Sequence, residues 1–201
     1  FNVVCGERDT GRALIAHKIP AMVSITGSIR AGIEVAKSAA DNVKKVHLEL
    51  GGKAPVVVFA DCDLAAAAET IAITGFFNAG QDCTAATRVI VEASAYDKFV
   101  ELLANEANTK IAVGNPDEDV LVGPVNNKNQ LERVKGFIDR LPSHAKVVAG
   151  GKVLDRPGFF FAPTVVADLK QDDEIIQNEV FGPVITVQKF TDEAQAIQYA
   201  N

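Results

Sequence analysis

Apolar and polar positions along the chain follow two periods, which predicts an α/β protein. Short apolar runs typical of buried strands lie at residues 21–25, 55–59, 89–91 and 184–187. Between the first two runs, apolar residues recur at helical spacing over residues 29–40, and Ser28 stands where an N-cap belongs. Strands that alternate with helices in this way favour a sheet covered by helices.

Other segments continue this alternation. We expect a glycine turn at residues 6–11 that opens a short helix, and strands on both sides of Glu49. Further helices are predicted at residues 64–77, 96–108, 130–141 and 192–201, and further strands at residues 146–148 and 159–161. The predicted division falls near Gly51, which gives a first domain at residues 1–51 and a second at residues 52–201.

Two predicted loops carry groups suited to covalent catalysis. Cys83 follows a glycine-containing turn and precedes the apolar run at 89–91, so its thiol should be exposed above buried structure. Glu49 ends an apolar strand, where a carboxylate is only partly solvated and suits the role of a general base. A thiol together with a base makes an activated nucleophile.

Three stretches that include these residues resemble the signature sequences of the aldehyde dehydrogenases. They lie in the same order at residues 48–53 (LELGGK), 80–83 (GQDC) and 178–183 (NEVFGP). The resemblance covers residues 1–201, and the stretch 78–85 looks most like the bacterial aminobutyraldehyde dehydrogenases. It implies that the first domain is the end of a Rossmann-type dinucleotide-binding domain and that the second is most of a catalytic α/β domain. The ligand site would lie between them.

The resemblance also implies a reaction, the NAD(P)-dependent oxidation of a small-molecule aldehyde to a carboxylate. Cys83 would attack the aldehyde carbon to form a thiohemiacetal, and a hydride would then pass to the nicotinamide. Glu49 would activate the water that hydrolyses the resulting thioester, and the backbone amide of Cys83 would stabilise the oxyanion. We expect NAD as the cofactor, and the sequence leaves NADP open.

Cofactor contacts are implied at several further positions. Thr26, Gly27 and Ser28 match the phosphate-contacting turn of the family, and Glu179 and Phe181 match residues that hold the nicotinamide ribose and orient the ring. Weaker matches to cofactor contacts are Leu50, Gly51, Gly11, Gln130 and Arg133. A helix N-terminus with a hydroxyl cap suits a phosphate because its backbone amides are free, although an ordinary N-cap at Ser28 needs no ligand. Around Gly11 the chain departs from the family pattern, because charged residues stand between the two outer glycines.

Asp82, directly before Cys83, gives a prediction about the substrate. An unpaired carboxylate at a desolvated site is costly, and a cationic substrate would pair with it. We therefore expect an amino-aldehyde such as 4-aminobutanal. The alternative is that Asp82 caps a neighbouring turn, a position in which aspartate is common.

Two other functions remain open on the residues alone. His47 and Glu49 lie two positions apart and share one face of a strand, which allows a cysteine-dependent hydrolase or acyl transferase built on Cys83. The chain could also be a non-catalytic relative that keeps the fold without turnover.

Composition argues against several other classes of protein. The net charge is −6, the pI is near 5.1 and no basic block is present, so neither nucleic acid nor a membrane surface is an expected partner. The three cysteines, Cys5, Cys62 and Cys83, suggest neither a disulfide framework nor a zinc site, which fits a reducing cytoplasm. The acidic turn at residues 114–119 lacks the spacing of a calcium loop, so we expect no metal.

The two ends of the sequence give a further expectation. The chain has no initiator methionine and ends inside a predicted helix, so we expect an interior piece of a longer enzyme. Members of the family assemble as dimers or tetramers, and the resemblance implies a homo-oligomer of the full-length protein.

Overall fold

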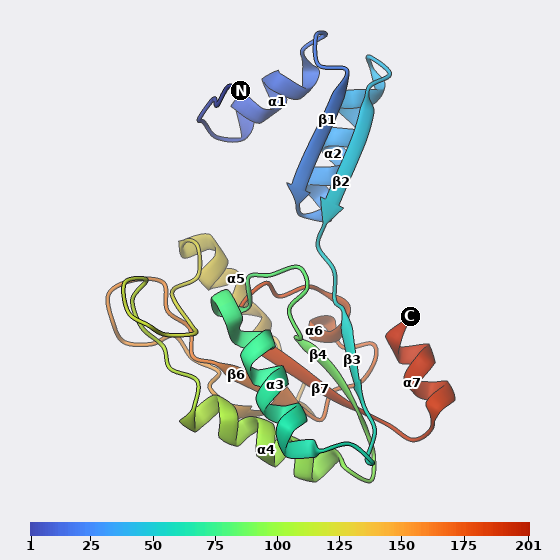
Figure 1. The fold of residues 1–201 in the computed structure, drawn as a ribbon, viewed down its shortest axis with the longest axis vertical. Helices are drawn as coiled ribbons and strands as arrows, with labels where there is room; N and C mark the ends of the chain where they lie inside the picture. The colour runs from blue at the N-terminus through green and yellow to red at the C-terminus, as the bar shows by residue number, and fades with distance from the viewer. The chain divides into compact units, whose positions relative to one another are not determined.

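The computed structural model describes all residues from 1 to 201 and divides into two compact units, Phe1–Gly52 and Lys53–Asn201 (Figure 1). Each unit has its own sheet and its own apolar core. None of the helices has both the length and the apolar character that crossing a bilayer requires. The roles that the sequence predicts for the two domains remain predictions.

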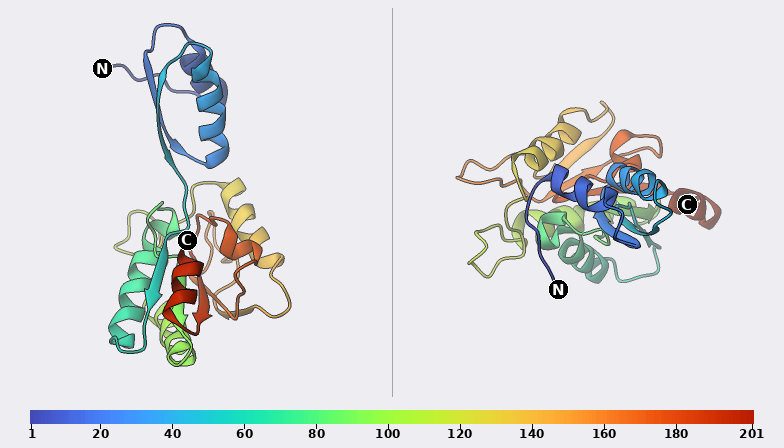
Figure 2. Two further views of the ribbon diagram at one scale, coloured as in Figure 1. Left: turned by 90° about the vertical axis from the view of Figure 1, so that its right-hand side faces the viewer. Right: turned by 90° about the horizontal axis from the view of Figure 1, so that it is seen from above.

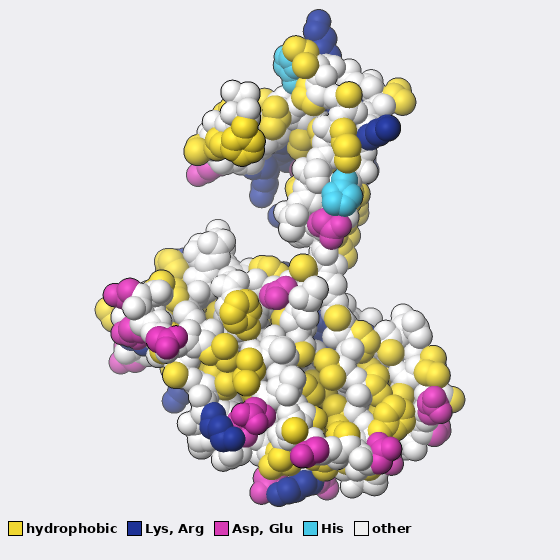
Figure 3. All heavy atoms as spheres, in the orientation of Figure 1, with side chains coloured by type: hydrophobic (Ala, Val, Ile, Leu, Met, Phe, Trp, Pro, Cys, Tyr) yellow, Lys and Arg dark blue, Asp and Glu magenta, His cyan; other side chains and the backbone are white.

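The first unit is a two-stranded parallel sheet with helices on one face. Its elements are α1 (Arg8–Ala16), β1 (Met22–Gly27), α2 (Ile29–Ala40) and β2 (Lys45–Leu50). Val23, Val35 and Ala39 form a small core between the sheet and α2, which lies along one face of the strands (Figure 2). The opposite face carries polar side chains, and Figure 3 shows a histidine beside an acidic side chain there.

Helix α2 begins as its sequence predicts. The Ser28 hydroxyl oxygen accepts a hydrogen bond from the amide of Ala31 at 3.3 Å, which confirms the N-cap. Gly32 lets the helix approach the sheet, because a Cβ at this position would lie 2.6 Å from a methyl carbon of Leu50. The helix therefore packs closely on the end of β2.

Helix α1 differs from its prediction. It begins at Arg8, so Gly11 lies inside the helix and not in a turn that precedes it. A glycine in a helix interior costs only about 1 kcal/mol relative to alanine. Asp9 in the first turn offsets part of that cost, because a carboxylate near a helix N-terminus is stabilised by the helix dipole.

The second unit is a five-stranded sheet in the order β3-β4-β7-β6-β5, with β5 alone antiparallel to its neighbour. Its elements are β3 (Pro55–Val58), α3 (Leu64–Phe76), η1 (Phe77–Gly80), β4 (Arg88–Glu92), α4 (Tyr96–Thr109), α5 (Lys128–Asp139), β5 (Lys146–Ala149), β6 (Thr164–Ala167), α6 (Glu174–Gln177), β7 (Val184–Phe190) and α7 (Glu193–Ala200). Helices cover both faces: Val89 and Val91 of β4 join the core beneath α3 and α4, whereas Ile90 packs with Ala196 of α7.

One predicted strand of this unit is absent and one strand is unforeseen. Phe161 makes only an isolated bridge with Val153, and residues 159–161 form no strand. Gly158, at a φ of 114°, and Pro163 bracket this short extended segment and limit its pairing. The buried strand β6, which follows Pro163, was not predicted.

The side chain of Arg88 joins three segments of the second unit. Its Nε donates to the carbonyl of Lys53 at 2.9 Å, and its two terminal nitrogens donate to the carbonyls of Tyr199 and Ala200 at 2.9 and 3.1 Å. Desolvation by burial lowers the pKa of this guanidinium. Arg88 thus binds the start of the unit and the last turn of α7 to strand β4.

Candidate active site

Residues 77–87, which we call the cysteine loop, connect α3 to β4. The backbone of this loop is closely constrained. Asn78 and Ala79 have φ angles of 50° and 56°, a region that non-glycine residues seldom occupy. The side-chain amide of Asn78 donates to the carbonyl of Gln81 at 3.1 Å, and that of Gln81 donates to the carbonyl of Asn78 at 3.2 Å. These two hydrogen bonds close the turn at residues 78–81, and Cys83, two positions later, is exposed.

Asp82 is engaged within this loop. Its Oδ1 accepts hydrogen bonds from the amide and from the hydroxyl of Thr84, both at 2.9 Å. These bonds, the amide first, lower the pKa of the Asp82 carboxyl. These contacts are those of a turn cap, which is the alternative that the sequence left open for Asp82. The pairing of Asp82 with a substrate cation stays a prediction.

A second loop, at residues 179–182, lies directly against the cysteine loop. A Cβ added to Gly80 would lie 2.0 Å from the carbonyl oxygen of Gly182, so the two backbones touch at these glycines. Gly80 also has a φ of 67°, which favours glycine. The structure therefore brings the loop that carries Cys83 against the loop that carries Glu179 and Phe181, although the two loops are far apart in the sequence.

Helix α5 supports this second loop through two polar side chains. Gln130 donates to the carbonyls of Val180 and Phe181 at 3.1 and 2.6 Å, and Arg133 donates to the carbonyl of Glu179 at 2.6 Å. The ribose contacts expected of Gln130 and Arg133 stay predictions. In this structure the two side chains hold the backbone of the loop.

Lys53 is a buried ionisable group to which the sequence gave no role. Its Nζ is shut off from solvent and has no hydrogen-bond partner. Burial first, and then repulsion by Arg88, lower its pKa to about 7, and attraction by Glu179 opposes this shift.

We expect Lys53→Met to raise the free energy of unfolding at pH 7 by on the order of 3 kcal/mol, because methionine fills the site without a buried charge. Below pH 7 Lys53 is protonated in both the folded and the unfolded wild type, so the folded state is destabilised by the full free energy of burying the ammonium group. Between pH 7 and the ordinary pKa of 10.5 the unfolded chain binds the proton that the folded chain lacks, so wild-type stability rises with pH.

Urea unfolding of the full-length protein across this pH range measures the effect. The rise with pH should disappear in Lys53→Met and persist in a control, Lys152→Met, whose side chain is exposed. A rise of equal size in Lys53→Met would contradict this assignment.

The first unit gathers its predicted residues at the carboxyl ends of its two strands. Thr26 lies opposite Glu49, and Gly27 lies opposite Leu50. Ser28 follows directly as the cap of α2, and Gly51 follows β2. Ligands of open α/β sheets bind outside the carboxyl ends of parallel strands, so this is the expected position for a cofactor.

The environment of Glu49 differs from the prediction. Its side chain is 63% exposed and pairs with Nε2 of His47 at 3.2 Å, so within this unit the carboxylate is well solvated. The physical reason is that no element of residues 1–52 covers the sheet face opposite α2. Glu49 belongs to the first unit and Cys83 to the second, and their cooperation remains a prediction.

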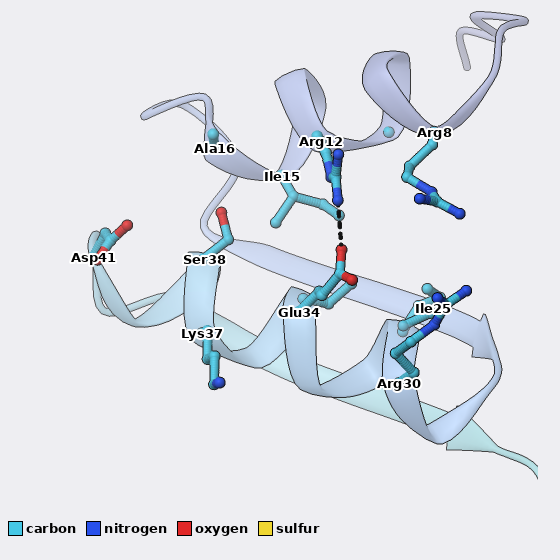
Figure 4. Close-up of a pocket in the computed structure, with 13 residues that line it drawn as sticks. Arg8, Arg12, Ile15, Ala16, Ile25, Arg30, Glu34, Lys37, Ser38 and Asp41 are labelled. Carbon is cyan, nitrogen blue, oxygen red and sulfur yellow. Dashed lines mark hydrogen bonds and ion pairs between the residues drawn. The ribbon is translucent and has the colours of Figure 1, made fainter.

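A cavity of about 830 Å³ lies between α1 and α2, and Figure 4 shows the side chains around it. Four basic residues line it, Arg8, Arg12, Arg30 and Lys37, together with Gly11. Arg12 pairs with Glu34 at 2.9 Å, and this contact holds the pKa of the Glu34 carboxyl below its usual range. The sequence prediction named only Gly11 here. Arg8 and Arg12 lie close to Gly11 in the sequence, but the prediction considered only the spacing of the glycines.

Comparison with known proteins decides the family. The model of the aldehyde dehydrogenase family matches residues 1–201. The chain belongs to the aldehyde dehydrogenase family. This result confirms the family resemblance that the three sequence stretches carry.

Among curated aldehyde dehydrogenases, lactaldehyde dehydrogenase of Escherichia coli (strain K12) is 42% identical over 205 residues, which cover 100% of this chain and 43% of that protein. A betaine aldehyde dehydrogenase of Brucella anthropi is 39% identical over 207 residues, which cover 100% of this chain and 42% of that protein. The chain thus spans less than half the length of these relatives. Neither relative is an aminobutyraldehyde dehydrogenase, so the finer likeness rests on residues 78–85.

Solved aldehyde dehydrogenases confirm the α/β fold. The crystal structure of E. coli lactaldehyde dehydrogenase matches with a TM-score of 0.91 and 40% identity over 95% of this chain and 40% of that one. Betaine aldehyde dehydrogenase from Staphylococcus aureus, in complex with NAD+, matches with a TM-score of 0.90 and 40% identity over 95% of this chain and 39% of that one.

Proposed function

We propose that the full-length protein oxidises an aldehyde to the carboxylate with NAD+, and that Cys83 is the nucleophile. The observation that carries this proposal is the position of Cys83 in a member of this family. It is an exposed thiol on a closed loop whose backbone touches the loop that contains Glu179. A loop that is held rigidly in this way favours catalysis because it keeps the reacting sulfur in place.

The residues present fit a dinucleotide. Its phosphates need positive charge and free backbone amides. Four basic side chains line the cavity beside α2, and one of them, Arg30, lies in the first turn of this helix, next to its Ser28 cap. Thr26, Gly27 and Ser28 would hold the phosphates, and Glu179 and Phe181 would hold the ribose and the ring at the other end. Leu50 and Gly51 would add further contacts to the cofactor. When bound, NAD+ supplies the acceptor for the hydride.

Cys83 and Glu49 carry the covalent steps in this proposal. The thiolate of Cys83 adds to the aldehyde carbon, and its own backbone amide donates to the oxygen that becomes negative. Loss of a hydride from that carbon leaves a thioester on Cys83. Glu49 then takes a proton from water, the hydroxide adds to the thioester carbon, and the carbon–sulfur bond breaks to release the carboxylate and the thiolate.

We propose an amino-aldehyde as the substrate, because Asp82 places a carboxylate next to the nucleophile. Its lowered pKa keeps it charged at neutral pH, so it would attract an ammonium group. Betaine aldehyde is cationic and lactaldehyde is neutral, so the names of the two relatives leave the substrate charge open. NADH formation from NAD+ and 4-aminobutanal by the full-length protein tests the function, because neither a cysteine hydrolase nor a non-catalytic relative would form NADH.

We expect Asp82→Asn to raise the KM for 4-aminobutanal by about fivefold, since a partly exposed ion pair contributes up to about 1 kcal/mol. The KM for butanal should stay the same, because an uncharged chain makes no ion pair. Asparagine keeps the oxygen that accepts from Thr84, so the turn is retained and butanal serves as the matched control. Equal increases for both aldehydes would make Asp82 a structural residue and remove its support for an amino-aldehyde.

A further inference from the structure

Three polar side chains form a row on the uncovered face of the two-stranded sheet, joined by one hydrogen bond and one ion-pair contact. Ser24 of β1 lies opposite His47 of β2, and its hydroxyl is 3.0 Å from Nδ1 of the imidazole. The other ring nitrogen, Nε2, lies 3.2 Å from Oε1 of Glu49. His47 and Glu49 share this face because successive strand residues alternate sides.

The chemistry of the three groups fixes which ring nitrogen of His47 carries the proton at each of these two contacts. An ionised carboxylate only accepts, so Nε2 of His47 must carry the proton that is shared with Glu49. In the neutral imidazole the second nitrogen is then an acceptor, and the hydroxyl of Ser24 donates to Nδ1. The row therefore runs as a single chain of donors from Ser24 through His47 to Glu49, and it selects one tautomer of the ring.

We propose that His47 is a positioning residue for Glu49, an inference that rests on the proposed role of Glu49 as general base. The imidazole N–H holds Oε1 of the carboxylate, which leaves the other oxygen to take a proton from water. Ser24 in turn holds the ring in the tautomer and orientation that this contact needs. Glu49 requires such a partner because its side chain is 63% exposed and no packing restrains it.

The role of His47 is orientation, so its loss should slow the step that uses Glu49 and leave substrate binding alone. We expect His47→Val in the full-length protein to lower the steady-state rate by roughly tenfold, since a small displacement of a catalytic group costs on the order of 10- to 100-fold. The first burst of NADH and the KM for the aldehyde should be those of the wild type. Valine suits an exposed strand position, and a full burst shows that the active site is folded.

Two further variants separate orientation from a general effect on the strand. His47→Gln carries an amide N–H that can reach Glu49, and we expect it to recover most of the lost rate. Lys45→Val changes the same face of β2 two residues earlier, and we expect wild-type kinetics. Failure of glutamine to recover the rate would overturn the hydrogen-bonding role.

A spectroscopic measurement tests the contact without turnover. The ¹⁵N signals of the His47 ring, assigned by comparison with His47→Gln, should report protonation at Nε2 when the ring is neutral. Ser24→Ala should shift the Nδ1 signal, because this nitrogen loses its donor. An Nδ1-protonated ring in the wild type would overturn the proposal.

The kinetic outcomes distinguish this inference from the function on which it rests. If Glu49→Gln slows turnover and His47→Val does not, the positioning role is wrong and the function of Glu49 stands. If Glu49→Gln turns over like the wild type, the general-base role is wrong and the proposal for His47 falls with it.

Discussion

Replacing Cys83 with alanine abolishes aldehyde oxidation in the full-length protein, with turnover lower by on the order of 10⁴-fold or more. Without the sulfur no covalent intermediate forms, and no other side chain of the cysteine loop is a nucleophile of comparable strength. NADH absorbance under saturating aldehyde measures the loss. Binding of NADH, followed by its fluorescence, should change little, because alanine removes one atom from an exposed position and leaves the loop closed by Asn78 and Gln81.

The chain offers a matched control for this substitution. Cys62 is also an exposed thiol and lies in the turn before α3, away from both loops of the candidate site. Cys62→Ala should keep wild-type turnover. Turnover close to the wild type in Cys83→Ala would end the proposal that Cys83 is the nucleophile.

Replacing Glu49 with glutamine produces a rapid burst of NADH followed by turnover that is slower by roughly 100-fold, because a neutral amide cannot accept a proton from water. The burst reports hydride loss from the Cys83 adduct, which does not require Glu49 in the proposed scheme. Stopped-flow absorbance resolves the two phases, and mass spectrometry of the stalled protein should detect the thioester on Cys83.

Glu69→Gln provides the control, because Glu69 is an exposed glutamate on α3 and makes the same change of charge. It should show wild-type kinetics in both phases. An equal loss of burst and steady rate in Glu49→Gln would move Glu49 to a step before hydride loss.

The features that the sequence predicted correctly depend on neighbours in the chain. The apolar period of residues 29–40 and the hydroxyl of Ser28 predict α2 and its cap, because both act within one or two helical turns. The strand after Cys83 is likewise marked by a local apolar run. Family signatures added the candidate site, since they record which local stretches meet in space.

The features that the sequence missed depend on contacts across space. The low pKa of Lys53 arises from burial next to Arg88, and no local pattern encodes that proximity. The exposure of Glu49 follows from the lack of a covering layer over one sheet face, although the alternating residues 45–50 (KVHLEL) are typical of a strand with one exposed face. The short helix near Gly11 was predicted, but its start was placed too late, because residues 6–11 were assigned to a glycine turn.

The binding of α7 by Arg88 has a consequence for synthesis on the ribosome. Arg88 and Tyr199 are 111 positions apart, and β4 pairs on one side with the late strand β7. At about 5 to 20 residues per second, β4 waits roughly 5 to 20 seconds for these partners. During that interval an apolar strand with an open edge is available to chaperones and to other nascent chains, so the second unit must complete its folding late in translation.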